Sequence, residues 1–351
     1  MTDSTLTVST HTILCATNCI SYRLLRALHS RNPTSMSTSV PLTRPFVLIL
    51  FAFEIASGLL RALRVRRVLL RFRRTYTVNF GGSIMNEKRM PVVFSGHGSP
   101  MLALEDNSVT RGLRIIGSQI TEQFGKPKAI LAVSAHWYTK GTFVQSTENP
   151  KQVYDMYGFP KALYDFKYPV KGSPELSGRV SALLGGKVSV NDDWGIDHGT
   201  WTVLCHMFPE ADVPVVQLSV DGTLSPDEIY NLGKALSPLR DEGYLILASG
   251  NVVHNLRLVE WDNPDGSPQC LAFNEAITEY VRNREDDRVI AYEYVPNAGY
   301  AAPTPEHFLP LLYMLGAAEG EKPLVFNNHC ELGAIAMTGY AFGLDFFMAG
   351  C

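Results

Sequence analysis

The sequence predicts an α/β domain whose functional residues gather at one edge of a central sheet. Short apolar runs, each suited to a buried strand, alternate with segments in which apolar residues recur at helical spacing. Three of the apolar runs are followed within a few residues by a histidine. Because open α/β sheets bind ligands outside the carboxyl ends of their strands, we expect these histidines to converge there.

The charge of the 351-residue chain changes sharply near residue 85. Residues 1–84 hold eleven arginines, no lysine and two acidic residues, a net charge of +9, so the rest of the chain carries −12. An acidic domain argues against a nucleic-acid partner, since phosphate binding draws on clustered Lys and Arg. A small molecule is the expected ligand. Six cysteines without Cys-x-x-Cys spacing indicate a reducing compartment, and hence a cytoplasmic protein.

Residues 1–84 form a basic extension that we expect to lie outside the fold. Their apolar run at 45–60 is shorter than the about 20 residues of a membrane-spanning helix. Seven arginines follow that run at 61–74, whereas a secretory signal places its charges first. Three interpretations stay open: a weak membrane anchor within 45–74, an arginine-rich targeting segment, or residues ahead of the true start at Met85. We favour the last, which places one domain at 85–351.

The first strand is predicted at 90–93, and it leads into a histidine between two glycines. Glycine permits backbone angles that other residues avoid, so Gly96 and Gly98 suit a tight turn that presents His97 to a cleft. An ordinary turn with an exposed histidine is the alternative.

The same arrangement recurs twice along the chain. The strand predicted at 129–134 delivers His136, and the strand at 244–249 runs through Gly250 towards His254. The other elements alternate as expected for an α/β domain, with helices at 108–124, 173–184, 226–239 and 270–283, and with strands at 188–190, 214–220, 324–326 and 334–342.

Two further histidines are predicted at the starts of helices. Asp197 can stabilise a charge on His198, or it can cap the helix that follows, and both roles are compatible. His307 stands in Thr-Pro-Glu-His, a pattern typical of a helix start. In contrast, His206 is expected among apolar core residues and His329 in a loop.

Residues 150–171 are rich in aromatic residues, which suits either a loop over a cleft or a surface loop packed by its own rings. The aromatic residues are Tyr154, Tyr157, Phe159, Tyr164, Phe166 and Tyr168.

A metal site explains the histidines more simply than core packing does. Five of the nine histidines (97, 136, 198, 254 and 307) lie at the ends of predicted elements. Neutral imidazole is the commonest protein ligand for zinc and iron, and no cysteine pair indicates a structural zinc. The phosphate-loop, Rossmann and Gly-x-Ser-x-Gly patterns are absent from the sequence.

Five short motifs stand in a fixed order within residues 90–342: Gly96-His97-Gly98-Ser99-Pro100, Ser134-Ala135-His136-Trp137, Asp197-His198-Gly199, Ser249-Gly250-Asn251-Val252-Val253-His254 and Thr304-Pro305-Glu306-His307. In this order and spacing they resemble the class III extradiol ring-cleavage dioxygenases, specifically the 4,5-DOPA dioxygenase branch. Residues 1–84 have no counterpart in that family.

The resemblance implies a single α/β domain with a central mixed, mostly parallel sheet and one non-haem divalent metal ion. Iron(II) is the expected catalytic ion, and zinc the ion expected in the isolated protein. A catechol would be opened beside its hydroxyls by dioxygen. Carried over by position, His97, His136, His254 and His307 match metal-binding histidines, and His198 matches a histidine beside the substrate.

The role of His254 is open at this point. Four histidines around one tetrahedral zinc would leave no position for dioxygen, so His254 is either a ligand of a resting zinc form or an acid and base in the iron form. Two other functions are compatible with the same residues, a zinc hydrolase and a non-catalytic binding protein. Retention of all five motif histidines argues against the latter.

Overall fold

The computed structural model describes residues 88–345. The predicted extension 1–84 and the boundary at Met85 lie outside the described residues and stay predictions. The central sheet confirms the predicted α/β architecture. From one edge to the other its eight strands are β4 (Val188–Val190), β3 (Thr142–Val144), β5 (Val215–Asp221), β2 (Ile130–Thr139), β6 (Leu245–Gly250), β1 (Val92–Gly96), β10 (Gly339–Phe342) and β7 (Pro323–Phe326).

The centre of the sheet is parallel and its margins are mixed. Strand β6 pairs in parallel with both β1 and β2, and β2 pairs in parallel with β5. Strand β10 is antiparallel to β1 and β7, and β3 is antiparallel to β5. The parallel strands therefore point their carboxyl ends to one edge, where three of the five motifs lie.

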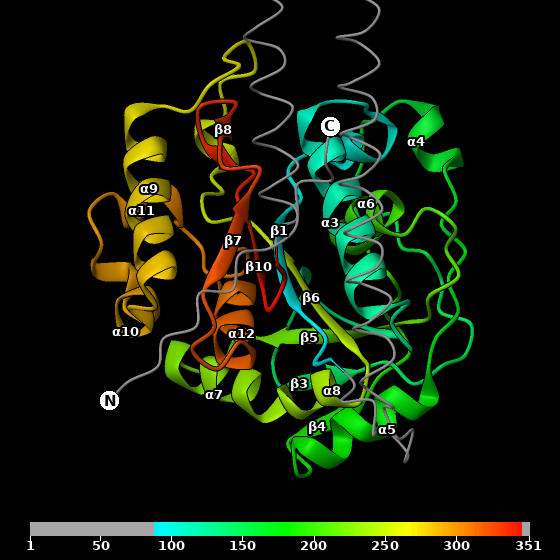
Figure 1. Ribbon diagram of the computed structural model, residues 1–351. Helices are drawn as coiled ribbons and strands as arrows, with labels where there is room; N and C mark the ends of the chain where they lie inside the picture. The colour runs from blue at the N-terminus through cyan, green and yellow to red at the C-terminus, as the bar shows by residue number, and fades with distance from the viewer. Residues whose placement is uncertain (1–87, 346–351) are drawn as a thin grey trace, which may run out of the picture. The chain divides into compact units, whose positions relative to one another are not determined.

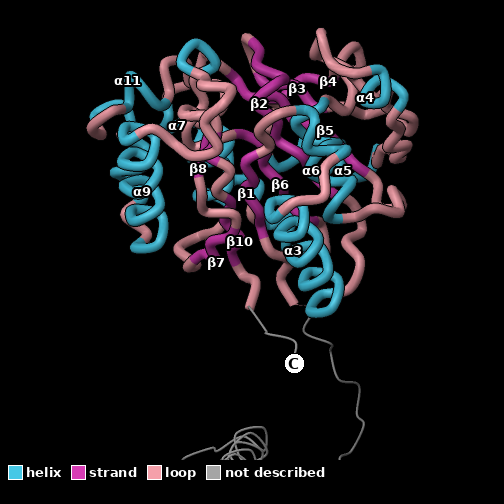
Figure 2. The backbone as a smooth tube through the Cα atoms, turned by 90° about the horizontal axis from the view of Figure 1, so that it is seen from above, coloured by secondary structure: helices cyan, strands magenta, loops and turns pink. Residues whose placement is uncertain are grey.

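Helices cover both faces of the sheet (Figures 1 and 2). Alternate residues of β1 serve the two faces: Val93 joins the core beneath α3 and α6, whereas Val92 and Phe94 join the opposite core. This two-sided burial explains why the central strands read as continuous apolar runs. One face carries α3 (Ser108–Phe124) and α6 (His198–Met207), and the other carries α5 (Pro174–Leu183), α7 (Pro226–Leu236), α9 (Pro268–Asn283) and α12 (Leu309–Ala317).

Short elements complete the described chain. They are α4 (Lys161–Asp165), α8 (Pro238–Asp241), α10 (Asp286–Ile290), α11 (Ala298–Ala301), the two-stranded pair β8 (Cys330–Glu331) and β9 (Ile335–Ala336), and the 3₁₀ helices η1 (Pro100–Leu104), η2 (Leu256–Leu258) and η3 (Tyr292–Tyr294).

Proline moves two predicted helix boundaries. The helix predicted at 226–239 divides into α7 and α8 at Pro238, because proline lacks an amide hydrogen and its ring collides with the preceding turn. Pro310 lies in the first turn of α12, which therefore begins at Leu309. His307 thus occupies the turn before the helix rather than the helix itself. Within 88–345, no helix combines the length and apolar character needed to cross a bilayer.

Candidate active site

The five motif histidines lie together at the carboxyl edge of the parallel strands. His97 follows β1, and His136 lies within β2, which extends beyond its predicted end. His198 is the first residue of α6, His254 follows β6 and pairs with β9, and His307 precedes α12. Convergence of these elements confirms the arrangement expected from the strand ends.

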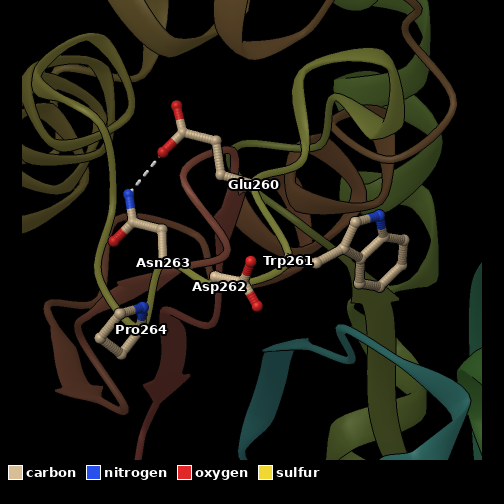
Figure 3. Close-up of a pocket in the computed structure, with 5 residues that line it drawn as sticks. All are labelled: Glu260, Trp261, Asp262, Asn263 and Pro264. Carbon is tan, nitrogen blue, oxygen red and sulfur yellow. Dashed lines mark hydrogen bonds between the residues drawn. The ribbon is translucent and has the colours of Figure 1, made fainter.

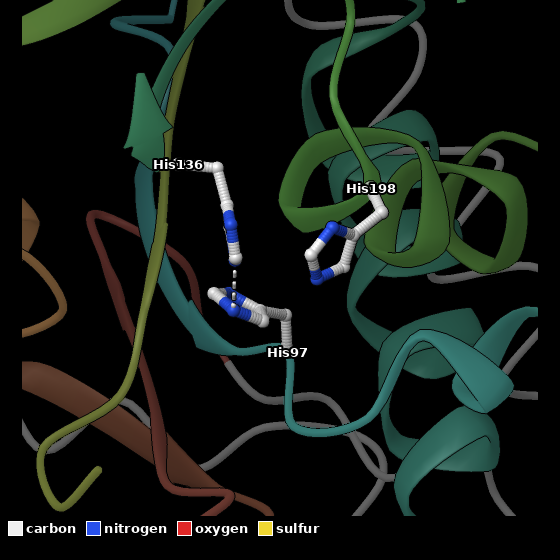
Figure 4. A group of neighbouring side chains, drawn as sticks. All are labelled: His97, His136 and His198. Carbon is white, nitrogen blue, oxygen red and sulfur yellow. Dashed lines mark hydrogen bonds between the residues drawn. The ribbon is translucent and has the colours of Figure 1, made fainter. Parts of the chain in front are cut away.

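Three of the rings form a nearly equilateral triangle. The ring centres of His97 and His136 are 4.9 Å apart, and that of His307 lies 5.3 Å from His97 and 5.1 Å from His136. The Nε2 atoms of His97 and His136 face each other at 3.0 Å (Figure 4). The Nε2 atom of His307 is buried and has no hydrogen-bond partner.

Hydrogen bonds to the opposite ring nitrogens assign the tautomers of these three rings. Ser249 donates its hydroxyl proton to the Gly199 carbonyl, so it accepts from His97 Nδ1 at 2.9 Å. His136 Nδ1 lies 3.0 Å from an Asp155 carboxylate oxygen, and His307 Nδ1 lies 3.3 Å from Glu306 Oε1. In each ring Nδ1 carries the hydrogen, and Nε2 is left with its lone pair.

This donor set fits a divalent metal ion. Bare lone pairs of His97 and His136 facing each other at 3.0 Å repel, and either a proton on one nitrogen or a metal ion bound by both relieves this repulsion. An ion about 2.0–2.1 Å from a nitrogen of each ring would hold the ring centres about 5 Å apart, a spacing that the observed triangle matches. Hydrogen bonds from Nδ1 to oxygen partners are also typical of metal-binding histidines.

His254 and His198 have geometries that differ from those of the triangle. The His254 ring is stacked on that of His307, with centres 3.4 Å apart and planes 9° from parallel. Because an imidazole binds an ion in its own plane, two parallel stacked rings do not converge on one ion. The His198 and His136 ring centres are only 3.9 Å apart, closer than two ligands of one tetrahedral ion.

Potential metal-binding atoms fall into two groups whose members lie within 4.8 Å of one another. One group contains His97, His136 and His198, and the other contains His254, Glu306 and His307. Proximity alone would thus divide the site in two. We favour the triangle across both groups, because its three ring centres are all about 5 Å apart, whereas the His136 and His198 rings are closer and the His254 and His307 rings are stacked.

Burial keeps most of this cluster uncharged. Burial, followed by the charges of neighbouring histidines, holds the pKa values of His97 and His307 well below the usual histidine value. The same causes lower the pKa of His254 to about 4. These rings are neutral at pH 7, the form that a metal ion binds.

Asp155 is the carboxylate of the site that the sequence did not reveal. One of its oxygens lies 2.8 Å from His198 Nδ1, and the other lies 3.0 Å from His136 Nδ1. Although burial opposes charge, these hydrogen bonds hold the pKa of Asp155 well below its usual value and raise that of His136. Burial nevertheless keeps the pKa of His198 below the ordinary value.

Asp197 has both of its predicted roles. It caps α6 by accepting from the Thr200 amide, and its negative charge favours the protonated form of His198, although the His198 ring hydrogen-bonds to Asp155 instead. The Asp197 carboxylate also accepts hydrogen bonds from Ser134, Trp194 and Gln217.

The aromatic residues of 150–171 mostly pack on the body of the protein. The ring centres of Tyr154 and Phe166 lie 5.8 and 5.7 Å, respectively, from that of Trp201. The Tyr168 hydroxyl donates a hydrogen bond to backbone carbonyls of the α6 region. Only Tyr157, 93% exposed, projects freely among them. These rings thus pack largely on the α6 region rather than on one another, and the same segment brings Asp155 to the histidine cluster.

The two histidines expected to be incidental lie outside the triangle. Buried His206 forms a hydrogen bond of 2.8 Å between its Nε2 atom and the Leu102 carbonyl oxygen. His329 lies in a loop, with its Nε2 atom 3.8 Å from Glu331 Oε2.

Two strand-end glycines allow the backbone to approach the site closely. A Cβ atom at Gly96 would lie 2.8 Å from the Met337 backbone, and one at Gly250 would lie 2.2 Å from the His307 carbonyl oxygen. Gly250 also accepts a hydrogen bond from the His97 amide. Glycine at 250 therefore lets the His97 and His307 segments meet.

Two hollows lie outside the histidine cluster. One, of about 430 Å³, is lined by the loop 260–264, whose Asn263 side chain donates to Glu260 (Figure 3). The other, of about 420 Å³, shares Trp261 with it and borders Ser99 and Met101 after the His97 turn. Neither is lined by any of the five histidines.

Comparison with known proteins adds an independent finding. Residues 91–343 match the family described as the catalytic LigB subunit of aromatic ring-opening dioxygenase. The chain is 43% identical to a 4,5-DOPA dioxygenase extradiol of Escherichia coli over 74% of this chain and 97% of that protein. It is 40% identical to the protein of that name from Beta vulgaris, over 71% and 95%.

A solved structure is similar as well. The crystal structure of an uncharacterized protein from Escherichia coli K12 superimposes with a TM-score of 0.62 and 39% sequence identity. The match covers 72% of this chain and 100% of the other.

Proposed function

This chain belongs to the LigB family of aromatic ring-opening dioxygenases and is an extradiol ring-opening dioxygenase, and we propose that a metal-bound form of it opens a DOPA-like catechol. The names of the Escherichia coli and Beta vulgaris relatives support the substrate class. The convergence of the His97, His136 and His307 rings, with the first two Nε2 atoms 3.0 Å apart, supports the metal. This convergence is the observation that carries the proposal.

In this proposal His97, His136 and His307 hold one divalent ion through their Nε2 atoms. Their second nitrogens are already engaged by Ser249, Asp155 and Glu306, which fixes the ring orientations before an ion arrives. Three protein ligands leave open positions, as a catalytic metal requires. Iron(II) would supply the chemistry by binding catechol and dioxygen together and passing electron density between them.

The proposed proton carriers are His198 and His254. Ring opening begins when the catechol loses hydroxyl protons, and it ends when one ring bond beside the hydroxyls is broken and both oxygen atoms of dioxygen are in the product. The hydrogen bond to Asp155 places the hydrogen of the His198 ring on Nδ1, so Nε2 is free to accept a proton. His254, stacked on His307, is the second candidate to take and return one.

We propose that residues 85–351 form the catalytic domain and that it works in the cytoplasm. Support for the domain comes from the family match at 91–343, and support for the compartment comes from scattered cysteines without a disulfide framework.

The test is anaerobic reconstitution with iron(II), followed by oxygen uptake over a panel of catechols, with the zinc-loaded protein as the control. We expect about one ion per chain and oxygen uptake only with iron. His97→Ala, His136→Ala and His307→Ala should each lose the ion, because removal of a direct ligand removes much of the binding energy.

Variants of the proton carriers separate metal binding from proton transfer. His254→Gln and His198→Gln should keep most of the ion while turnover falls by about 10²- to 10⁴-fold. Full metal content in the three alanine variants would refute the ligand set. Ester hydrolysis by the zinc form, without oxygen uptake by the iron form, would favour a hydrolase.

A further inference from the structure

We propose that Asp155 is a positioning residue that fixes the ring orientation and tautomer of His136 and His198 together. The inference rests on the proposed function only for the roles of the two rings, one as a metal ligand and the other as a proton carrier. Asp155 belongs to none of the five motifs.

Three N–H groups converge on the Asp155 carboxylate. His136 Nδ1 lies 3.0 Å from Oδ2, and His198 Nδ1 lies 2.8 Å from Oδ1. The backbone amide of His198 donates to Oδ1 as well, at 3.2 Å. That amide opens α6, so the partial positive charge of the helix start also favours an ionised carboxylate. An ionised carboxylate is acceptor-only, and both rings must therefore present a hydrogen at Nδ1.

The consequence appears at the other side of each ring. With hydrogen on Nδ1, the Nε2 atoms of His136 and His198 both carry lone pairs. His136 points its lone pair at His97 Nε2, 3.0 Å away, whereas His198 keeps its own available for a proton (Figure 4). One carboxylate thus sets two different functions, and moving it disturbs both.

The backbone around Asp155 is held in place before any ligand binds. The Val153 amide donates to the Ile196 carbonyl at 2.8 Å, and Trp201 Nε1 donates to the Val153 carbonyl at 3.0 Å. The Tyr154 ring packs on Trp201. The Asp155 side chain itself is only 13% exposed. A pre-positioned, shielded carboxylate is what the geometric control of two rings requires.

The first test is Asp155→Asn, which changes a carboxylate oxygen into an amide with little change of shape. Its single oxygen accepts from one ring, and its NH₂ group faces the Nδ1–H of the other. That ring must turn or move its hydrogen to Nε2. We expect about 10- to 100-fold weaker binding of zinc or cobalt(II), and a fall in kcat.

Asp165→Asn is the matched control. Asp165 ends α4 ten residues further along, its side chain is 59% exposed, and its partner among residues 88–345 is Lys161. This variant should bind metal and turn over as the wild type does. In the His198→Gln background, Asp155→Asn should still weaken metal binding, yet lower kcat much less than in the wild type, because the proton carrier is already gone.

The second test needs no folded variant of Asp155. Histidine ¹⁵N spectra of metal-free wild-type protein, assigned with His136→Gln and His198→Gln, should show hydrogen on Nδ1 in both rings. A hydrogen on Nε2 with none on Nδ1 in either ring would overturn the proposal, as would wild-type metal affinity in Asp155→Asn. Metal titration and these spectra use no catechol, so a chain without catechol turnover would refute the proposed function while leaving the Asp155 test intact.

Discussion

Gly250→Ala should disable the site from a position that carries no functional side chain. The new methyl group would lie 2.2 Å from the His307 carbonyl oxygen, where ordinary contacts begin at 3.4 Å. The two segments must then separate by roughly 1 Å, and overpacking of this kind costs about 1–3 kcal/mol of folding free energy. Since the His97 amide also hydrogen-bonds to the Gly250 carbonyl, two corners of the triangle, His97 and His307, are displaced.

A displacement of about 1 Å in a catalytic site can cost on the order of 10²-fold in rate. We therefore expect Gly250→Ala to melt at a lower temperature, to bind zinc more weakly, and to lose roughly that factor in turnover with iron. Gly178→Ala is the control, because Gly178 lies on α5 with nothing within 4 Å of the added methyl group. It should be neutral or stabilise the helix by up to about 1 kcal/mol. Wild-type metal affinity and turnover in Gly250→Ala would refute the claim that close backbone approach sets the site.

Three further predictions concern stability and the limits of the domain. The pKa of His254 is about 4 in the folded protein and near 6.5 in the unfolded chain. The unfolded chain therefore binds the proton more readily, and the free energy of unfolding falls as the pH drops below 6.5. Metal-free protein should lose about 2 kcal/mol from this ring between pH 7 and pH 5, and urea unfolding of His254→Gln should lack that part of the slope. Asp197→Ala removes the cap of α6 and should cost at least about 0.5–2 kcal/mol in the same assay; an unchanged midpoint would contradict the cap. A chain starting at Met85 should fold and turn over like the full chain, and an insoluble or inactive product would show that the preceding residues belong to the fold.

The parts of the site that could be predicted are those encoded locally. A buried strand, a glycine that permits close approach and a histidine follow one another within a few residues at His97 and His254. Parallel strands then bring such ends to one edge without further information. The cap of α6 by Asp197 is likewise a short-range feature. Prolines at 238 and 310 were visible too, but the helical spacing of apolar residues concealed the boundaries they impose.

Long-range placement accounts for what could not be predicted. Asp155 stands in an irregular segment, and nothing local distinguishes it from Asp165, which ends on the surface. The stacking of His254 on His307 joins residues from distant parts of the chain and depends on the angle between two rings. Neither composition nor periodicity carries such information, so the geometry that distinguishes His254 from the triangle could not be predicted.

The pairing of β1 has a consequence for the order in which the sheet forms during synthesis. Its partners β6 and β10 both come from the later part of the chain, with Val92 opposite Ile246 on one side and Phe342 on the other. Pairing across such distances has to meet the entropy of closing a long loop. During synthesis β1 therefore waits for most of the domain to emerge before it is fixed in the sheet. His307 follows later than β6 does, so the proposed metal-binding triangle is incomplete in a growing chain until the domain is nearly finished.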